Sequence, residues 1–117
     1  MNAGLVVVDG ANVVGSVPDG WWRDRRAAAV RLRDRLADYA EDHPEAEVVL
    51  VLEGAARGVA SVPGVRVSEA PTDGDSHIVA VVAESAEPCV VVTADRELRG
   101  RVESLGATCV GPRTVYP

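Results

Sequence analysis

Short apolar runs recur along the chain, each bounded by glycine, proline or a polar side chain. Runs of this kind, dominated by valine, are typical of strands that are buried on both faces of a parallel sheet. Five such runs predict strands at residues 5–8, 48–52, 65–67, 89–92 and 107–110.

Longer segments with helical spacing lie between these strands. They predict helices at about residues 21–41, 75–85 and 95–105. In the first of these, Ala28, Leu32 and Leu36 recur at helical spacing, while arginine and aspartate fill the other face. Segments 10–20 and 54–64 carry glycine and proline and are predicted to be loops, the second with room for one helical turn.

The alternation of strands and helices predicts an α/β fold, because strand–helix–strand units build a parallel sheet with helices over its faces. We expect a three-layer α/β/α sandwich with a mostly parallel five-stranded sheet. The 117 residues show no linker, repeat or low-complexity segment, and they are enough to bury one core. A single domain over residues 1–117 is therefore expected.

The charge and composition of the chain limit the cellular locations and the binding partners that we expect. No apolar run approaches the ~20 residues that cross a bilayer, and the N-terminus has no basic flank, so we expect a cytoplasmic protein without a membrane segment. Cys89 and Cys109 lie in valine-rich runs without metal-ligand spacing and are expected to be buried, reduced thiols. The net charge of −6 disfavours nucleic-acid binding, because phosphate affinity comes mainly from lysine and arginine.

Polar side chains follow the predicted strands where ligands bind in open α/β sheets, beyond the carboxyl ends of the strands. They are Asp9 after the first strand, Glu53 after the second, and Thr93 and Asp95 after the fourth. Asp73 and Asp75 are expected at the same edge because they open the helix before the fourth strand. A carboxylate cluster without histidine or cysteine suits Mg²⁺ or Mn²⁺. A metal in such a site activates water for phosphodiester hydrolysis without a nucleophilic side chain. This chemistry fits a chain that has no convincing Ser-His-Asp or Cys-His set.

Structural roles compete with catalysis at most of these positions. Thr72 and Asp73 have the residue types of helix caps, and Asp95 is also placed to cap the last predicted helix. Glu53 is explained equally well as a loop residue. Asp9 is harder to explain structurally, because a carboxylate that directly follows four buried residues lies deep at the sheet edge.

Three short motifs occur in order over almost the whole chain. They are Val7-Val8-Asp9-Gly10-Ala11-Asn12-Val13-Val14-Gly15, then Asp75-Ser76-His77-Ile78-Val79, then Val92-Thr93-Ala94-Asp95-Arg96-Glu97-Leu98. The first resembles the opening motif of the NYN branch of the PIN-like nuclease superfamily, and more closely that of the YacP-like ribonucleases. The other two resemble the acidic motifs that follow in that family. Each motif alone is weak, and their conjunction makes the resemblance specific.

The resemblance implies a PIN-like fold and a metal-dependent endoribonuclease that cleaves single-stranded RNA with Mg²⁺ or Mn²⁺. Asp9, Asp75 and Asp95 would be the metal-binding acids. Asn12 would hold Asp9 or the scissile phosphate through its amide, and Thr93 would orient a carboxylate from the second shell of the metal. Some family members act on messages at the ribosome, so ribosome-associated mRNA is an implied partner.

One position departs from the family pattern. Ser76 stands where the family often has a second acid. Asp73 or Glu53 is left as the source of the missing charge, and the number of metal ions is left open.

RNA contacts are predicted from arginine and tryptophan near the same edge. Most arginines of the first predicted helix fit a solvated face with acidic partners at helical spacing. Arg23 and Arg96 are nearest the predicted site and are expected to bind RNA. One of Trp21 and Trp22 is expected to anchor the helix in the core, and the other, which we assign as Trp22, to stack on a base.

A second function stays open beside the nuclease. A catalytically degenerate PIN-like module that binds RNA or a protein without cleaving is favoured by Ser76 and by the acidic charge. A phosphotransfer receiver needs a lysine, which the chain lacks, and a haloacid-dehalogenase-type site needs Asp-x-Asp, whereas Gly10 and Ala11 follow Asp9. The RNA substrate and the oligomeric state, including a homodimer, are left open.

Overall fold

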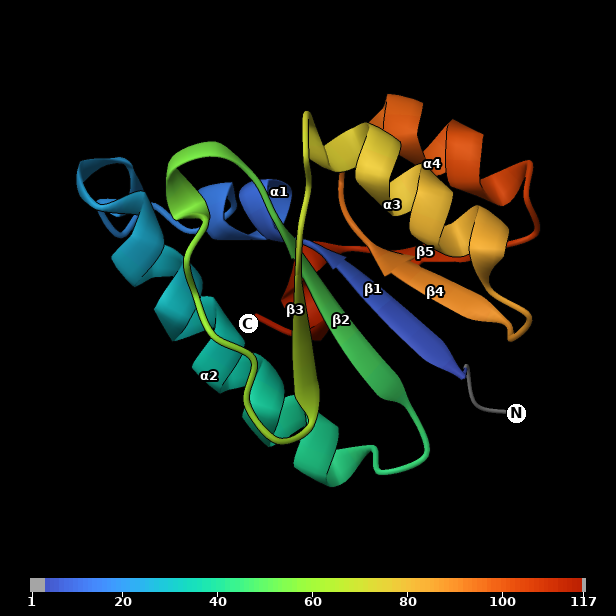
Figure 1. Cartoon of the computed structure of the whole chain (residues 1–117), viewed down its shortest axis with the longest axis horizontal. Coiled ribbons are helices and arrows are strands. Elements are labelled where there is room, and N and C mark those ends of the chain that lie inside the picture. The colour runs from blue at the N-terminus through green and yellow to red at the C-terminus, as the bar shows by residue number, and fades with distance from the viewer. Residues whose placement is uncertain (1–3, 117) are drawn as a thin grey trace.

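A computed structural model describes residues 4–116 and shows one sheet of five parallel strands with helices on both faces (Figure 1). The strands are β1 (Leu5–Asp9), β2 (Glu47–Leu52), β3 (Val65–Glu69), β4 (Cys89–Val92) and β5 (Thr108–Val110). Their order across the sheet is β3-β2-β1-β4-β5. The predicted α/β fold is confirmed, and the sheet is parallel throughout rather than mostly parallel.

Within the described residues, four α-helices and two 3₁₀ turns connect the strands, and a third 3₁₀ turn follows β5. They are α1 (Gly10–Gly15), η1 (Trp21–Arg23), α2 (Arg25–Asp42), η2 (Gly54–Ala56), α3 (Gly74–Glu84), α4 (Arg96–Glu103) and η3 (Pro112–Thr114). Figure 1 shows α2 on one face of the sheet and α3 with α4 on the other. The chain adds strands to one side of β1 and then crosses to the other side, so the helices of the two halves cover opposite faces.

Several element boundaries differ from the sequence prediction. The segment 10–20 is predicted to be a loop, whereas its first six residues form α1. The long helix starts at Arg25 rather than at Trp21, because the Asp24 side chain caps it by accepting from the Ala27 amide at 3.0 Å. At α3 the capping residue is Asp73 rather than Thr72.

Alternate residues of β1 face two separate cores. Val6 and Val8 pack with the buried leucines of α2, whereas Leu5 and Val7 pack with the buried side chains of α3 and α4. This follows from the two-residue period of a strand. Asp9 continues the alternation of Leu5 and Val7, so its side chain lies toward the layer of α3 and α4.

Arginines of α2 fasten the connection between β2 and β3, which contains no α-helix. Arg26 donates to the Gly58 carbonyl at 2.8 Å, and Arg33 donates to the Ala60 carbonyl at 3.0 Å. These α2 arginines therefore have a structural role, but their partners are loop carbonyls rather than the acids at helical spacing that the sequence predicts. They also hold the β2–β3 segment close to the start of α2.

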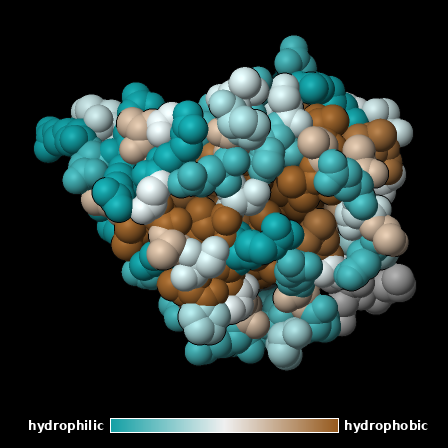
Figure 2. Space-filling view, in the orientation of Figure 1, coloured by the Kyte–Doolittle hydropathy of each residue, from teal (hydrophilic) through white to brown (hydrophobic). Residues whose placement is uncertain are grey.

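Hydrophobic side chains are visible on part of the surface, and the two cysteines differ in burial. Figure 2 shows hydrophobic side chains between the largely hydrophilic outer surfaces of the helical layers. No helix within residues 4–116 is long and apolar enough to cross a membrane. Cys89 is buried as predicted, Cys109 is only half-buried, and both are free thiols.

Candidate active site

Asp9 lies at the centre of the carboxyl edge of the sheet, where the order of strands changes direction between β1 and β4. Its residue is only 4% exposed. One carboxylate oxygen accepts from the Asn12 backbone amide at 3.4 Å, because Asp9 is the N-cap of α1. The other accepts from the Thr93 hydroxyl at 2.9 Å. The carboxylate is thus held on both oxygens at the point where open α/β sheets bind ligands.

Thr93 connects two of the predicted acids. Its side chain is fully buried directly after β4, the strand that pairs with β1. The hydroxyl donates to Asp9 and accepts from the Asp95 backbone amide at 3.1 Å. Asp95 in turn caps α4, accepting from the Leu98 amide at 3.1 Å. The structural role that competes for Asp95 is therefore present, and it holds the carboxylate at the N-terminus of α4.

Asn12 links α1 to the turn after β4. Its side-chain oxygen accepts from the Ala94 amide at 2.8 Å. The bond between Asn12 and Asp9 comes from the Asn12 main chain rather than from its side chain. Asn12 therefore orders the turn that carries Thr93 and Asp95, and it supports Asp9 only through the helix.

Gly10 explains why the first motif has glycine after the aspartate. A Cβ at this position would lie 2.5 Å from the Val51 carbonyl oxygen and 2.8 Å from the Leu52 side chain. Because backbone atoms of β2 cannot move aside, only glycine lets α1 start this close to the sheet. The close approach brings the first turn of α1 to Asp9.

Asp75 joins the edge from the opposite helical layer. It lies in the first turn of α3 and is half-buried. Burial raises its pKa, and the negative charges of Asp95 and Glu53 raise it further. Asp73, one residue before the helix, is exposed and caps α3 by accepting from the Ser76 amide at 2.8 Å, a bond that lowers its pKa.

Glu53 follows β2 and reaches the start of α3. A Cβ at Gly74 would lie 2.7 Å from a Glu53 carboxylate oxygen, so the glycine makes room for this side chain. Glu53 therefore lies between the end of β2 and Asp75. Its charge acts on both Asp75 and Asp9.

The electrostatics of the edge reflect this gathering of acids. Burial raises the pKa of Asp9, the hydrogen bonds from Thr93 and Asn12 partly offset the rise, and the charges of Asp75 and Glu53 add to it. Repulsion of this kind is relieved when a cation binds between carboxylates. The edge is acidic, and within residues 4–116 no arginine forms an ion pair with Asp9.

The oxygen donors fit a hard divalent cation, although they are not gathered into a finished metal centre. Within residues 4–116, no group of three or more histidine, cysteine, aspartate and glutamate side chains has the geometry to hold a metal ion. Mg²⁺ usually keeps several waters and takes only one or two carboxylates directly. The donor set therefore suits a hydrated ion better than a fully liganded one.

The predicted RNA-binding residues are exposed near this edge. Arg23 and Arg96 are both exposed, and the Trp22 residue is 52% exposed. Trp21 is half-buried and packs against the core. The Arg25 guanidinium lies 5.1 Å from the centre of the Trp21 ring.

Two further arginines near the acids are not predicted from the sequence. Arg99 donates to the Thr93 carbonyl at 2.9 Å. The charge of Arg101 partly offsets the raised pKa of Asp75, and it adds to the lowering of the Asp73 pKa that the hydrogen bonds from Ser76 cause. In the sequence these arginines stand four and six residues after Asp95, which places them on the helix beside the acids. Which of the three α4 arginines faces the site depends on the rotation of that helix about its axis, and the sequence does not define this rotation.

Comparisons with known proteins agree with this fold. No family model matches the chain, and no curated protein matches it. Among solved structures, the crystal structure of a point mutant of Rae1 (YacP) from Bacillus subtilis matches with a TM-score of 0.73 and 21% sequence identity, covering 95% of this chain and 71% of that one. The chain has the fold of Rae1. At this level of identity the likeness concerns the fold.

Proposed function

We propose that this protein is a metal-dependent endoribonuclease that hydrolyses phosphodiester bonds in single-stranded RNA. The observation that carries the proposal is the buried Asp9 carboxylate, bonded to Thr93 at the strand-order switch and flanked by Asp75. The motif resemblance to YacP-like ribonucleases and the fold shared with Rae1 support it.

The residues at the edge have distinct parts in this reaction. Asp9, Asp75 and Asp95 would hold Mg²⁺ or Mn²⁺, directly or through the waters of the ion, and the charges of Glu53 and Asp73 act on the same edge. When bound, such a cation polarises a phosphoryl oxygen and lowers the pKa of a water. Thr93 orients Asp9 through its hydroxyl, and Asn12 holds the turn that carries Asp95.

The bond changes are those of hydrolysis. A water oxygen forms a bond to phosphorus, the bond between phosphorus and one ribose oxygen breaks, and that oxygen leaves with a proton from the water. The carboxylates would hold the cation to which the phosphate and the water bind, and they take no covalent part.

A non-cleaving RNA-binding module is the second candidate. Two observations favour it: no three acids are gathered for a metal within the described residues, and Ser76 replaces a second acid. In that case the edge binds RNA through its arginines and tryptophans without hydrolysing it.

Cleavage of end-labelled single-stranded RNA separates the two candidates. We expect wild type to cleave with Mn²⁺ or Mg²⁺, EDTA to stop it, and Asp9→Asn to slow it by more than about 100-fold, because even outer-shell partners of metal ligands are worth 10–100-fold. Asp38→Asn, at an exposed position on α2, is the matched control and should cleave like wild type. Folded protein that binds the RNA but never cleaves it would establish the binding module instead.

A further inference from the structure

A pocket of about 320 Å³ opens beside the acidic edge, between the start of α1, the start of α2 and the end of β2. Among the residues that line it are Val14, Trp21, Arg25, Leu52, Glu53 and Ala55. We call it the edge pocket. Apart from Glu53, none of the residues assigned above to metal binding or catalysis lines it.

The edge pocket and the acids share one rim but lie on opposite sides of it. Gly10 lines the pocket and directly follows Asp9 in the chain. Asp9 faces α3 and α4, whereas the pocket is bounded by α2. Glu53 belongs to both, since it lines the pocket and its charge acts on Asp9 and Asp75. A bound linear polymer that crosses the rim would therefore place one of its groups in the pocket and the neighbouring group at the acids.

The walls have the chemistry that recognises a nucleobase. Alanine, valine and leucine side chains give an apolar lining, and Trp21 with Arg25 supplies an aromatic ring and a planar guanidinium 5.1 Å away. Unpaired bases stack on both kinds of surface. The Glu53 carboxylate adds an acceptor for a base N–H. A phosphate group without a base would be attracted by Arg25 but repelled by the Glu53 carboxylate, so the pocket suits a base better than a phosphate.

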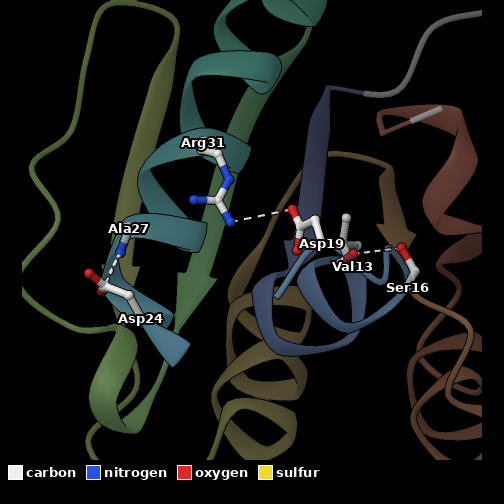
Figure 3. A network of polar contacts seen from close by, with 6 residues as sticks. All are labelled: Val13, Ser16, Asp19, Asp24, Ala27 and Arg31. Atoms are coloured by element: carbon white, nitrogen blue, oxygen red, sulfur yellow. Dashed lines mark hydrogen bonds and ion pairs between the residues drawn. The ribbon is translucent and has the colours of Figure 1, made fainter. Parts of the chain in front are cut away.

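The segment that carries Trp21 is fastened at both ends. Ser16 donates to the Val13 carbonyl at 2.6 Å at the end of α1, and Arg31 pairs with Asp19 at 3.3 Å (Figure 3). Asp24 caps α2 at the other end of η1. The wall formed by Trp21 and Arg25 is therefore held in place before any ligand arrives, which lowers the entropic cost of binding.

We propose that the edge pocket receives an unpaired nucleobase of the RNA strand next to the phosphate that is cleaved. This inference rests on the proposed function in one respect, which is that the polymer bound across the rim is RNA. It assigns Trp21 and Arg25 to base binding, beyond the exposed Trp22 and Arg23 that the sequence indicates.

Binding is tested without metal and without cleavage. In a Trp22→Phe background Trp21 is the only tryptophan, so its fluorescence reports the pocket. The protein is titrated in EDTA with each of the four nucleoside 5′-monophosphates and with ribose 5-phosphate, which has no base. At least one nucleotide is expected to quench Trp21 saturably at concentrations where ribose 5-phosphate does not. Equal responses to all five ligands would overturn the proposal.

Matched variants locate the binding. Ala55→Leu fills the pocket from an exposed wall position and should weaken nucleotide binding by at least about fivefold, the lower end of what base stacking contributes. Ala83→Leu makes the same change at an exposed position of α3 and should bind like the parent. Arg25→Gln should also weaken binding, whereas Arg66→Gln, on β3, should not. Binding that Ala55→Leu and Arg25→Gln leave unchanged would place the nucleotide elsewhere.

The outcome is separable from that of the proposed function. RNA cleavage without nucleotide binding in the edge pocket would reject the pocket and keep the nuclease. Nucleotide binding without RNA cleavage would keep the pocket and favour the non-cleaving module.

Discussion

The Asp9 carboxylate links protonation at the sheet edge to stability. Its pKa is raised in the folded protein, chiefly by burial, so the folded state holds this proton to a higher pH than the unfolded chain does. Ionisation of Asp9 therefore costs stability. The cost is absent below the unfolded pKa of about 3.9, grows as the pH rises through the raised native pKa, and is constant above it.

We predict that metal-free wild type loses stability relative to Asp9→Asn as the pH rises through this window. Asparagine has no charge to bury, so the variant lacks the penalty. Urea unfolding midpoints of both proteins in EDTA, taken from acid to neutral pH, give the difference, with Asp38→Asn as the control for an exposed position. A difference that stays constant with pH would show that the burial of Asp9 does not disfavour its charge.

Thr93 is the next residue whose role can be separated into structure and chemistry. Thr93→Val keeps the shape of the side chain but removes the bonds to Asp9 and to the Asp95 amide. We expect a loss of about 1–3 kcal/mol of unfolding free energy. We also expect the Mg²⁺ concentration needed for cleavage to rise about 10–100-fold, because orientation of a metal ligand is lost.

Thr93→Ser is the matched control, since it keeps the hydroxyl. It should restore the Mg²⁺ dependence even where the lost methyl group lowers stability. Denaturant titration and cleavage at graded Mg²⁺ concentrations measure the two effects separately. A valine variant that is less stable but has the wild-type Mg²⁺ dependence would limit Thr93 to a structural role.

At the scale of elements, the strands were predictable because valine runs mark buried strands, and the predicted sheet edge followed from them. α1 was not predictable, because six residues show no clear helical period and glycine stands at both of its ends. The placement of Asp9 and Thr93 at one edge follows from parallel pairing of β1 and β4. The wall of Trp21 and Arg25 could not be predicted, because it depends on how α2 is turned against η2.

The start of α1 allows a direct test of this close packing. Gly10→Ala places a Cβ against the Val51 carbonyl and should destabilise the protein by about 1–3 kcal/mol. Gly100→Ala, inside α4 with open space around the new Cβ, should instead stabilise it by about 0.5–1 kcal/mol. Thermal or urea unfolding of both variants provides the comparison. Stabilisation of both would mean that α1 can move away from β2.

For the molecule as a whole, the distribution of charge matters more than its sum of −6. Acids converge on the carboxyl edge, while several arginines of α2 are engaged in holding loops or in ion pairs, among them Arg26, Arg31 and Arg33. The folded state therefore contains a local repulsion, because the negative charges of Asp75 and Glu53 act on the buried Asp9. A divalent cation at this edge would act on the stability of the entire fold, because its ligands come from β1, α3 and the cap of α4.

We predict that Mg²⁺ raises the melting temperature of wild type and that Asp9→Asn abolishes most of the rise. A ligand that binds only the folded state contributes about 2.7 kcal/mol at 100 times its Kd, which corresponds to about 10 °C for a domain of this size. Thermal unfolding is followed by circular dichroism in Mg²⁺ and in NaCl of equal ionic strength, so that general screening is subtracted. Asp38→Asn should respond like wild type. If Asp9→Asn gained as much as wild type, Mg²⁺ would be neutralising the acidic surface at large, and Asp9 would have no privileged place in binding it.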